Sequence, residues 1–153
     1  MFYLRCDDRL LHGQIFYKWL KYLNLQRIII IDEILYHNQV EKQIILMAKP
    51  KNCDISFYDI SDLSKAKQEK QDCLVLFRSI IDSSRLVNEF QVNEINIAFK
   101  KGGIGKKKIL NNVFLSDKEM EVLQKLICNE IEVYSQILPT DEKYYINLDD
   151  VKK

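Results

Sequence analysis

Two apolar segments near the N-terminus are joined by the polar stretch Arg5-Cys6-Asp7-Asp8-Arg9-Leu10-Leu11-His12-Gly13-Gln14. The segment before it, Phe2-Tyr3-Leu4, is typical of a short strand, and apolar residues recur at helical spacing over residues 15–23 after it. We therefore expect a strand-to-helix turn that carries two arginines, two aspartates and a histidine.

A turn of this kind has a defined place in an α/β protein. It lies at the carboxyl end of its strand, the edge of an open sheet where ligands bind. The free N–H groups and the dipole at a helix N-terminus favour an anion such as phosphate. Arg5 and Arg9 add fixed charge that can bind two anion oxygens at once. His12 could then bind a phosphoryl group or carry one covalently.

The rest of the chain alternates strand and helix patterns. The unbroken apolar run Ile28-Ile29-Ile30-Ile31 is typical of a strand that is covered on both faces, as in a parallel sheet. Further strands are predicted at residues 54–58, 73–77, 94–98, 109–115 and 132–135. Helices are predicted over residues 15–23 and 36–48, through Leu63 and Ala66, from 79 or 82 to 90, and over 117–127. This order predicts an α/β fold: an open, mainly parallel, doubly wound sheet with helices on both faces, as a single domain over residues 1–153.

Five polar or cyclic residues predict where these elements begin and end. Ser116 and Glu119 form a capping-box pattern for the last helix. Ser79 or Asp82 could cap the helix after the fourth strand. Pro139 is expected to end the regular structure.

Composition excludes several function classes. The chain has 153 residues, 29% of them charged, and a net charge of +1, so its overall charge gives no argument for nucleic acid binding. The segment Gly102-Gly103-Ile104-Gly105 does not fit the phosphate-loop template. The lysines around it, at positions 100, 101 and 106–108, form either a solvated loop or a surface for an acidic partner.

The four cysteines show no zinc-binding spacing, so no metal site is expected. Cys53 and Cys73 fit the core of a reduced protein, and Cys6 is interpreted in the same way although it lies within the polar turn. No apolar run is long enough to span a bilayer, and Arg5 and Asp7 interrupt the apolar start, so no signal peptide is predicted.

The polar turn, with Trp19 after it, resembles the active-site signature of the IIB components of the mannose/fructose/sorbose family of sugar phosphotransferase systems. The resemblance extends from about residue 3 to about residue 147. It includes the segments Asp32-Glu33, Leu76-Phe77-Arg78-Ser79, Asn96-Ile97-Ala98, Val113-Phe114-Leu115-Ser116 and Pro139-Thr140-Asp141. Two departures, Ala98-Phe99 in place of a glycine pair and Ile80 in place of a proline, leave a divergent regulatory member possible.

The resemblance implies a phosphocarrier. Its histidine, His12 here, would accept a phosphoryl group from a phosphohistidine on the IIA component. It would pass the group to a sugar that enters through the IIC/IID membrane components, with no metal or organic cofactor. The protein would be cytoplasmic and held at the membrane by those partners. The sugar and the oligomeric state, including a possible homodimer, stay open.

The turn suggests a role for each neighbour of His12. Backbone N–H groups from Leu11 to Gln14 could cradle the phosphoryl oxygens, Gly13 permits a close backbone approach, and Arg9 and possibly Arg5 would neutralise charge. Asp7 or Asp8 could orient the imidazole or hold an arginine, or serve as a cap or a strand-end ion pair. By resemblance, Ser79 could donate a hydrogen bond to the phosphohistidine. Trp19 is expected in the core and His37 without function.

Two other classes were compared with the phosphocarrier. A receiver-type domain would be phosphorylated on an aspartate such as Asp54, but that residue lies at the start of a predicted strand. A nucleotide-binding or purely interacting domain lacks support because the turn has no G-x-G-x-x-G pattern.

Overall fold

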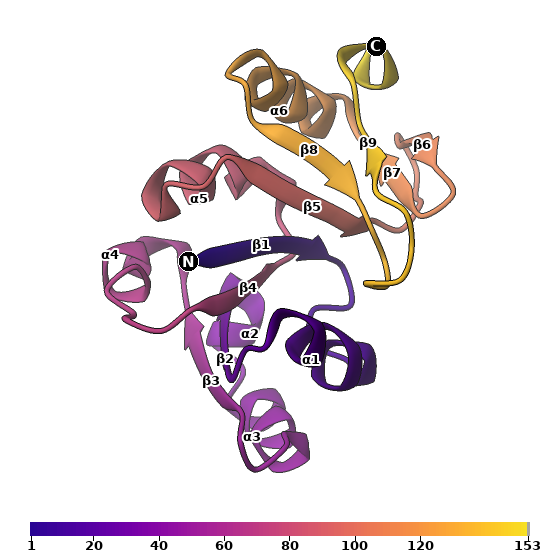
Figure 1. Ribbon diagram of the computed structural model, residues 1–153. Helices are drawn as coiled ribbons and strands as arrows, with labels where there is room; N and C mark the ends of the chain where they lie inside the picture. The colour runs from indigo at the N-terminus through magenta and orange to yellow at the C-terminus, as the bar shows by residue number, and fades with distance from the viewer. Residues whose placement is uncertain (153) are drawn as a thin grey trace.

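The predicted strands form one sheet of seven, in the order β3-β2-β4-β1-β5-β8-β9 (Figure 1). In the computed structural model, which describes residues 1–152, every pair of neighbours is parallel except β8 and β9. The strands are β1 (Phe2–Asp7), β2 (Arg27–Ile31), β3 (Asp54–Tyr58), β4 (Cys73–Phe77), β5 (Glu94–Phe99), β8 (Glu132–Ser135) and β9 (Tyr144–Tyr145). The first strand lies in the middle of the sheet, which places its carboxyl end between those of β4 and β5.

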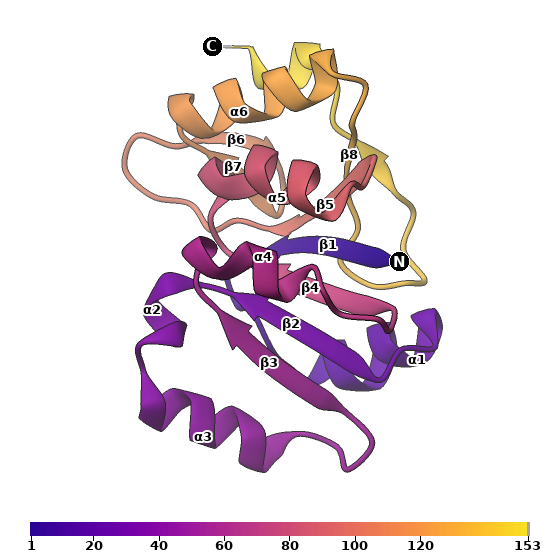
Figure 2. The same cartoon turned by 90° about the vertical axis from the view of Figure 1, so that its left-hand side faces the viewer.

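Helices cover both faces of this sheet (Figures 1 and 2). One face carries a helical stretch that begins with a wide turn at Ile15–Trp19 and continues as α1 (Leu20–Leu23), together with α2 (Glu33–Tyr36) and α3 (Gln39–Ala48). The other carries α4 (Leu63–Ala66), α5 (Ser83–Phe90) and α6 (Asp117–Cys128). The predicted doubly wound architecture is therefore confirmed.

The isoleucine run of β2 shows why both faces must be apolar. Ile29 and Ile31 belong to the core cluster beneath α4, α5 and α6, whereas Ile28 and Ile30 belong to the cluster beneath α1 and α2. All four side chains are buried. Successive side chains of a strand point to opposite faces, so a strand in the centre of a two-sided layer needs an unbroken apolar run.

Two predicted elements are each divided in the structure. The helix expected over residues 36–48 is α2 followed by α3, because Asp32 caps α2 at the N–H of Leu35 and Asn38 starts a new helix by capping the N–H of Glu41. The strand expected over residues 109–115 is a separate antiparallel pair, β6 (Lys107–Leu110) and β7 (Val113–Leu115). The polar pair at 111–112 reverses the chain between them.

Two boundary predictions are wrong. Neither Ser79 nor Asp82 caps a helix N–H with its side chain; a 3₁₀ turn at Ile80–Asp82 leads into α5 instead. Regular structure also continues beyond Pro139, through β9 and a 3₁₀ turn at Leu148–Val151. The buried side chain of Val151 packs in the core cluster on the α6 face, which explains why this tail is ordered.

Within residues 1–152, no helix combines the length and the apolar character needed to cross a membrane.

Removing the Ser116 cap tests the predicted start of α6. Its hydroxyl accepts the N–H of Glu119, whose carboxylate accepts the N–H of Ser116 in return. We expect Ser116→Ala to lower the free energy of unfolding by about 1 kcal/mol, measured by urea denaturation. Ser64→Ala, in the exposed middle of α4, is the matched control and should change it little; equal losses in both variants would contradict the assignment.

Candidate functional site

The polar turn leaves the carboxyl end of β1 and bends back over it. The N–H of Leu10 donates to the carbonyl of Asp7 at 2.9 Å, and the N–H of Ile15 donates to the carbonyl of His12 at 3.0 Å. Leu10 takes a left-handed backbone conformation (φ 52°) and is buried. An apolar residue seldom adopts this conformation, and burial of its side chain under the first helix holds it there.

The carboxylate of Asp7 is the centre of the site. It is completely buried and accepts five hydrogen bonds. Its Oδ1 accepts from the backbone N and the Nε of Arg9, at 2.9 and 3.0 Å. Its Oδ2 accepts from Nη2 of Arg9 at 2.8 Å, from Nη2 of Arg5 at 3.3 Å and from Nε2 of His12 at 3.3 Å. One carboxylate thus fixes both arginines and the histidine.

These contacts explain the charge state of Asp7. Burial alone would raise the pKa of the carboxyl, but the hydrogen bonds from His12 and Arg9 and the charge of Arg5 outweigh burial. The pKa of Asp7 is therefore held well below its ordinary value of 3.8. The group is a permanent anion that accepts hydrogen bonds at neutral pH.

The imidazole of His12 has one nitrogen toward Asp7 and the other free. Nε2 faces the carboxylate, and the side chain keeps 20% of its surface exposed. Within residues 1–152, Nδ1 has no hydrogen-bond partner. A neutral imidazole that donates from Nε2 carries its lone pair on Nδ1, so the geometry presents Nδ1 to an incoming group.

The two arginines occupy different environments, although both were predicted to neutralise an anion. Arg9 keeps 35% of its side chain exposed, stacks at 4.7 Å over the ring of Phe99, and has an Nη1 without a hydrogen bond in the described chain. Arg5 is buried, and burial lowers the pKa of its guanidinium to about 10 despite the adjacent Asp7. Arg9 is therefore the arginine that can meet a ligand from solvent.

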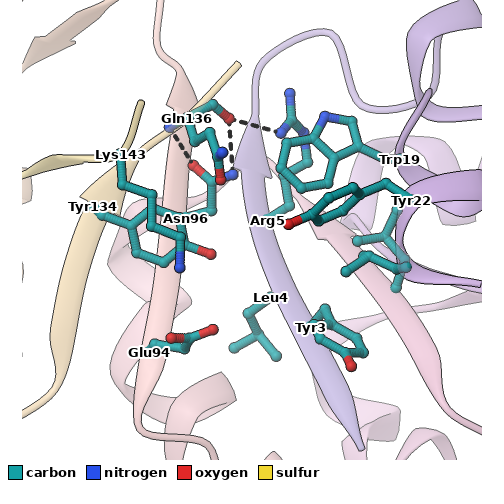
Figure 3. A pocket seen from close by; sticks show the side chains of 12 residues that line it. Tyr3, Leu4, Arg5, Trp19, Tyr22, Glu94, Asn96, Tyr134, Gln136 and Lys143 are labelled. Atoms are coloured by element: carbon teal, nitrogen blue, oxygen red, sulfur yellow. Dashed lines mark hydrogen bonds between the residues drawn. The ribbon is translucent and has the colours of Figure 1, made fainter. Parts of the chain in front are cut away.

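Arg5 instead ties the site to the C-terminal part of the chain (Figure 3). Its Nη1 and Nη2 donate to the carbonyls of Gln136 and Ile137, at 3.1 and 3.2 Å. Trp19 stacks against the Arg5 guanidinium at 5.0 Å and donates its indole N–H to the same Ile137 carbonyl at 2.8 Å. The expectation that Trp19 lies in the core is confirmed.

Asp8 lies in a second network, beside the first. Its Oδ1 accepts from Nζ of Lys100 at 2.7 Å, and its Oδ2 from the N–H of Lys101 at 2.7 Å. Nζ of Lys100 also donates to the carbonyl of Arg78 at 2.7 Å, and the Sγ of the buried Cys6 contacts that carbonyl at 3.4 Å. Of the two aspartates considered for His12, Asp7 contacts it and Asp8 holds the loops after β4 and β5.

The remaining predicted site residues fall into two groups. Leu11, Gly13 and Gln14 adjoin His12 at the start of the first helix, and both Gly13 and Gln14 are exposed. Ser79 is exposed at the end of β4 and lines a cavity with Asp32, Glu33, Asp82 and others. No described contact joins Ser79 to His12.

The expectation that Lys100 belongs to a solvated loop or to a surface for an acidic partner is wrong, because Lys100 is buried against Asp8. The sequence also carries no sign of the pairing of Arg78 with Asp32. Lys100 is 5% exposed, and a lysine this deeply buried needs an anionic partner, but the sequence does not identify that partner. The guanidinium of Arg78 forms two hydrogen bonds with Asp32, the cap of α2, and these raise the pKa of Arg78. The segments that carry Arg78 and Asp32 were noted for their family resemblance only.

Comparison with known proteins identifies the family. The family model described as "PTS system sorbose subfamily IIB component" matches residues 1–151. The chain belongs to this family of IIB components. It is thereby a phosphotransfer component of a sugar phosphotransferase system, as the turn motif predicted.

Individual relatives agree in sequence and fold. The chain is 27% identical to the mannose-specific EIIAB component of Escherichia coli K12, over 91% of this chain and 45% of that protein. It is 27% identical to the sorbose-specific EIIB component of Klebsiella pneumoniae, over 80% of this chain and 77% of that protein. The chain spans less than half the length of the E. coli relative.

Solved structures show the same architecture. The crystal structure of the IIBSor domain of the K. pneumoniae sorbose permease superposes with a TM-score of 0.87 at 23% identity, over 97% of this chain and 94% of that one. The crystal structure of manxB from Thermoanaerobacter tengcongensis gives 0.82 at 28% identity, over 99% and 94%.

Replacing Asp7 tests its position at the centre of this IIB site. Because its pKa is depressed in the folded protein, its stabilising effect is complete above the ordinary pKa of 3.8 and is lost as the pH falls below it. We expect Asp7→Asn to lower the free energy of unfolding by about 3 kcal/mol at neutral pH. In urea titrations at a series of pH values, the difference from wild type should shrink in acid. A difference that does not depend on pH would contradict this account.

Proposed function

We propose that the protein is a phosphocarrier that accepts a phosphoryl group on His12 from a IIA component and transfers it to a sugar during uptake. The observation that carries this proposal is the His12 imidazole, held at Nε2 by a buried carboxylate and open at Nδ1. Family membership supports phosphotransfer in general, and this geometry supports His12 as the carrier.

The first half-reaction exchanges one phosphorus–nitrogen bond for another. The Nδ1 lone pair of neutral His12 attacks the phosphorus of the donor phosphohistidine, and the donor P–N bond breaks with its electrons returning to the donor imidazole. Asp7 keeps the Nε2 proton in place, so Nδ1 stays nucleophilic. Positioning and charge stabilisation are what such transfers chiefly need from a protein.

Neighbouring groups would stabilise the transferred charge. The exposed part of Arg9 carries a free Nη1 that can bind a phosphoryl oxygen. Backbone N–H groups at Leu11, Gly13 and Gln14 adjoin His12 at the start of the helix, where intrahelical acceptors are lacking. Arg5 would act indirectly, because it donates to Asp7 and holds that carboxylate in place. Asp8 would act through Lys100, by fixing the loop on the other side of the turn.

The second half-reaction would regenerate the imidazole. A sugar hydroxyl oxygen attacks the phosphorus, the bond from phosphorus to Nδ1 breaks, and the hydroxyl proton leaves to solvent. Ser79 belongs to the carboxyl edge of the sheet and could assist if its loop moves toward His12. Sugar delivery would come from IIC/IID membrane components, with the protein cytoplasmic and held at the membrane by them. The E. coli relative is a mannose-specific EIIAB component, which supports a IIA partner.

The receiver alternative loses support in the structure. Asp54 begins β3 and pairs with Arg27, the first residue of β2. It therefore lies at the amino end of the parallel strands, whereas ligands of such sheets bind at the carboxyl end.

Phosphorylation with a donor system tests the proposal. The protein is incubated with phosphoenolpyruvate, the general phosphotransferase proteins and a matching IIA, and the modified residue is mapped by mass spectrometry. We expect an acid-labile, base-stable phosphate on His12 that is absent from His12→Ala. His37→Ala is the matched control, because His37 is the other histidine of the chain and is exposed; it should be phosphorylated like wild type. A base-labile phosphate on an aspartate, or no label with a competent IIA, would contradict the proposal.

Arg9 offers a graded test of the same site. Arg9→Lys keeps a positive charge but loses the paired hydrogen bonds to Asp7 and the guanidinium fork. We expect the rate of phosphorylation at His12 to fall roughly a hundredfold, as for loss of one preorganised donor, in rapid-quench measurements. The exposed Arg85→Lys in α5 should have no effect, and an unchanged rate in Arg9→Lys would remove Arg9 from the mechanism.

A further inference from the structure

A cavity lies on the α1 face of the sheet, beside the phosphorylation site but separate from it (Figure 3). Its floor is β1 and β5, and its walls are the first helix on one side and β8 with the C-terminal segment on the other. The helices of this face cover β2, β3 and β4, which leaves this part of the sheet open. The lining includes Arg5, Trp19, Tyr22, Glu94, Tyr134 and Lys143.

Several polar groups in this cavity have no partner within residues 1–152. The hydroxyl of Tyr134 makes no hydrogen bond, although Tyr134 is 8% exposed. The carboxylate of Glu94 has neither a hydrogen bond nor an ion pair, and Lys143 makes a single described contact, with its Nζ over the Tyr134 ring at 4.4 Å. The Nε of Arg5 is buried without a partner. Among the described residues of the lining, only Arg5 has a buried nitrogen or oxygen atom without a partner; Glu94 is half-buried and Lys143 is exposed, so these side chains can meet a ligand that enters from solvent.

Other polar groups of the lining already have hydrogen-bond partners within the protein, so they only shape the cavity. The amide of Asn96 donates to the carbonyl of Gln136 at 2.9 Å and accepts its N–H at 3.0 Å. The Gln136 side chain donates to the carbonyls of Pro139 and Asp141. These bonds fix the upper end of the cavity and hold the wall that carries Tyr134.

Size and chemistry together select a class of ligand. The cavity measures about 200 Å³, and a cavity of roughly 150 Å³ holds one benzene ring, so the space fits one substituted six-membered ring. Figure 3 shows the hydroxyls of Tyr22 and Tyr134 pointing into it from opposite walls. Aromatic surfaces with a few placed polar groups are typical of small-molecule sites.

We propose that this cavity binds a single monosaccharide, with ring C–H groups against the aromatic walls and hydroxyls on Glu94, Tyr134 and Lys143. The carboxylate accepts two neighbouring hydroxyls, and the phenol and ammonium groups donate to others. An anionic ligand would meet the carboxylate of Glu94, and an apolar ligand would use none of these polar groups. A nucleotide is too large for the measured space.

The cavity also touches the phosphorylation site through one side chain. Arg5 lines the cavity and donates to Asp7, the carboxylate that holds His12. An occupant that restricts Arg5 therefore acts on the position of His12, a consequence that rests on the proposed function. Binding itself does not rest on it, because it is measured on the unphosphorylated protein.

The chain supplies its own reporter for the test. Trp19 is the one tryptophan of the sequence and lies in the cavity wall. The unphosphorylated full chain is titrated with D-glucose, D-mannose and D-fructose separately, while Trp19 emission and backbone amide shifts are recorded. We expect a saturable change in emission with at least one sugar, and amide shifts centred on Leu4, Asn96 and Tyr134.

Two conservative variants keep the proposal falsifiable. Tyr134→Phe and Glu94→Gln each remove one polar partner without a change in shape, and each should weaken binding roughly threefold to tenfold, as for one lost hydrogen bond. Glu132→Gln is the matched control, because Glu132 is exposed on β8 and pairs in register with Glu94; it should bind like wild type. No saturable change with any sugar, shifts confined to the His12 turn, or unchanged affinity in both cavity variants would overturn the proposal. Failure of this test leaves His12 labelling unaffected, so the two proposals fail separately.

Discussion

Everything at the carboxyl end of β1 depends on one buried carboxylate that must stay charged. Asp7 is completely buried, and a buried anion is tolerated only when donors surround it. Arg5, Arg9 and His12 supply those donors from three directions. The requirement to solvate Asp7 therefore sets the position of the histidine, and the turn is folded around the carboxylate.

The same requirement couples distant parts of the chain. Arg5 donates from Nη2 to Asp7 and to the carbonyl of Ile137, and from Nη1 to the carbonyl of Gln136. Trp19 shares the Ile137 carbonyl, so the first helix, β1 and the segment after β8 are fixed together. On the opposite side, Lys100 ties Asp8 to the end of β4. The turn is thus held by the segment after β8 on one side and by the ends of β4 and β5 on the other.

Sequence patterns were sufficient for the architecture and for the place of the polar turn within it. The isoleucine run of β2 requires apolar layers on both sides, and the polar turn after β1 can lie only at the carboxyl edge. Patterns were insufficient where a single side chain decides: Asn38 divides a continuous helical periodicity by capping a new helix, and nothing local favours Asp7 over Asp8 as the partner of His12. The direction of the side chains at the end of β1 decides between them. Asp7 points to the same face of the sheet as Arg5, whereas Asp8 points toward Lys100. The burial of Lys100 likewise depends on tertiary contacts.

We propose that Asp7 holds the Nε2–H form of His12 and leaves Nδ1 as the nucleophile. The most direct measurement is the nitrogen-15 NMR spectrum of the imidazole in the unphosphorylated protein above the titration range of histidine. We predict a proton on Nε2 and an unprotonated Nδ1 for His12, with loss of this preference in Asp7→Asn. A proton on Nδ1 in the wild-type protein would contradict the account, because the nitrogen presented to the donor would then carry no lone pair.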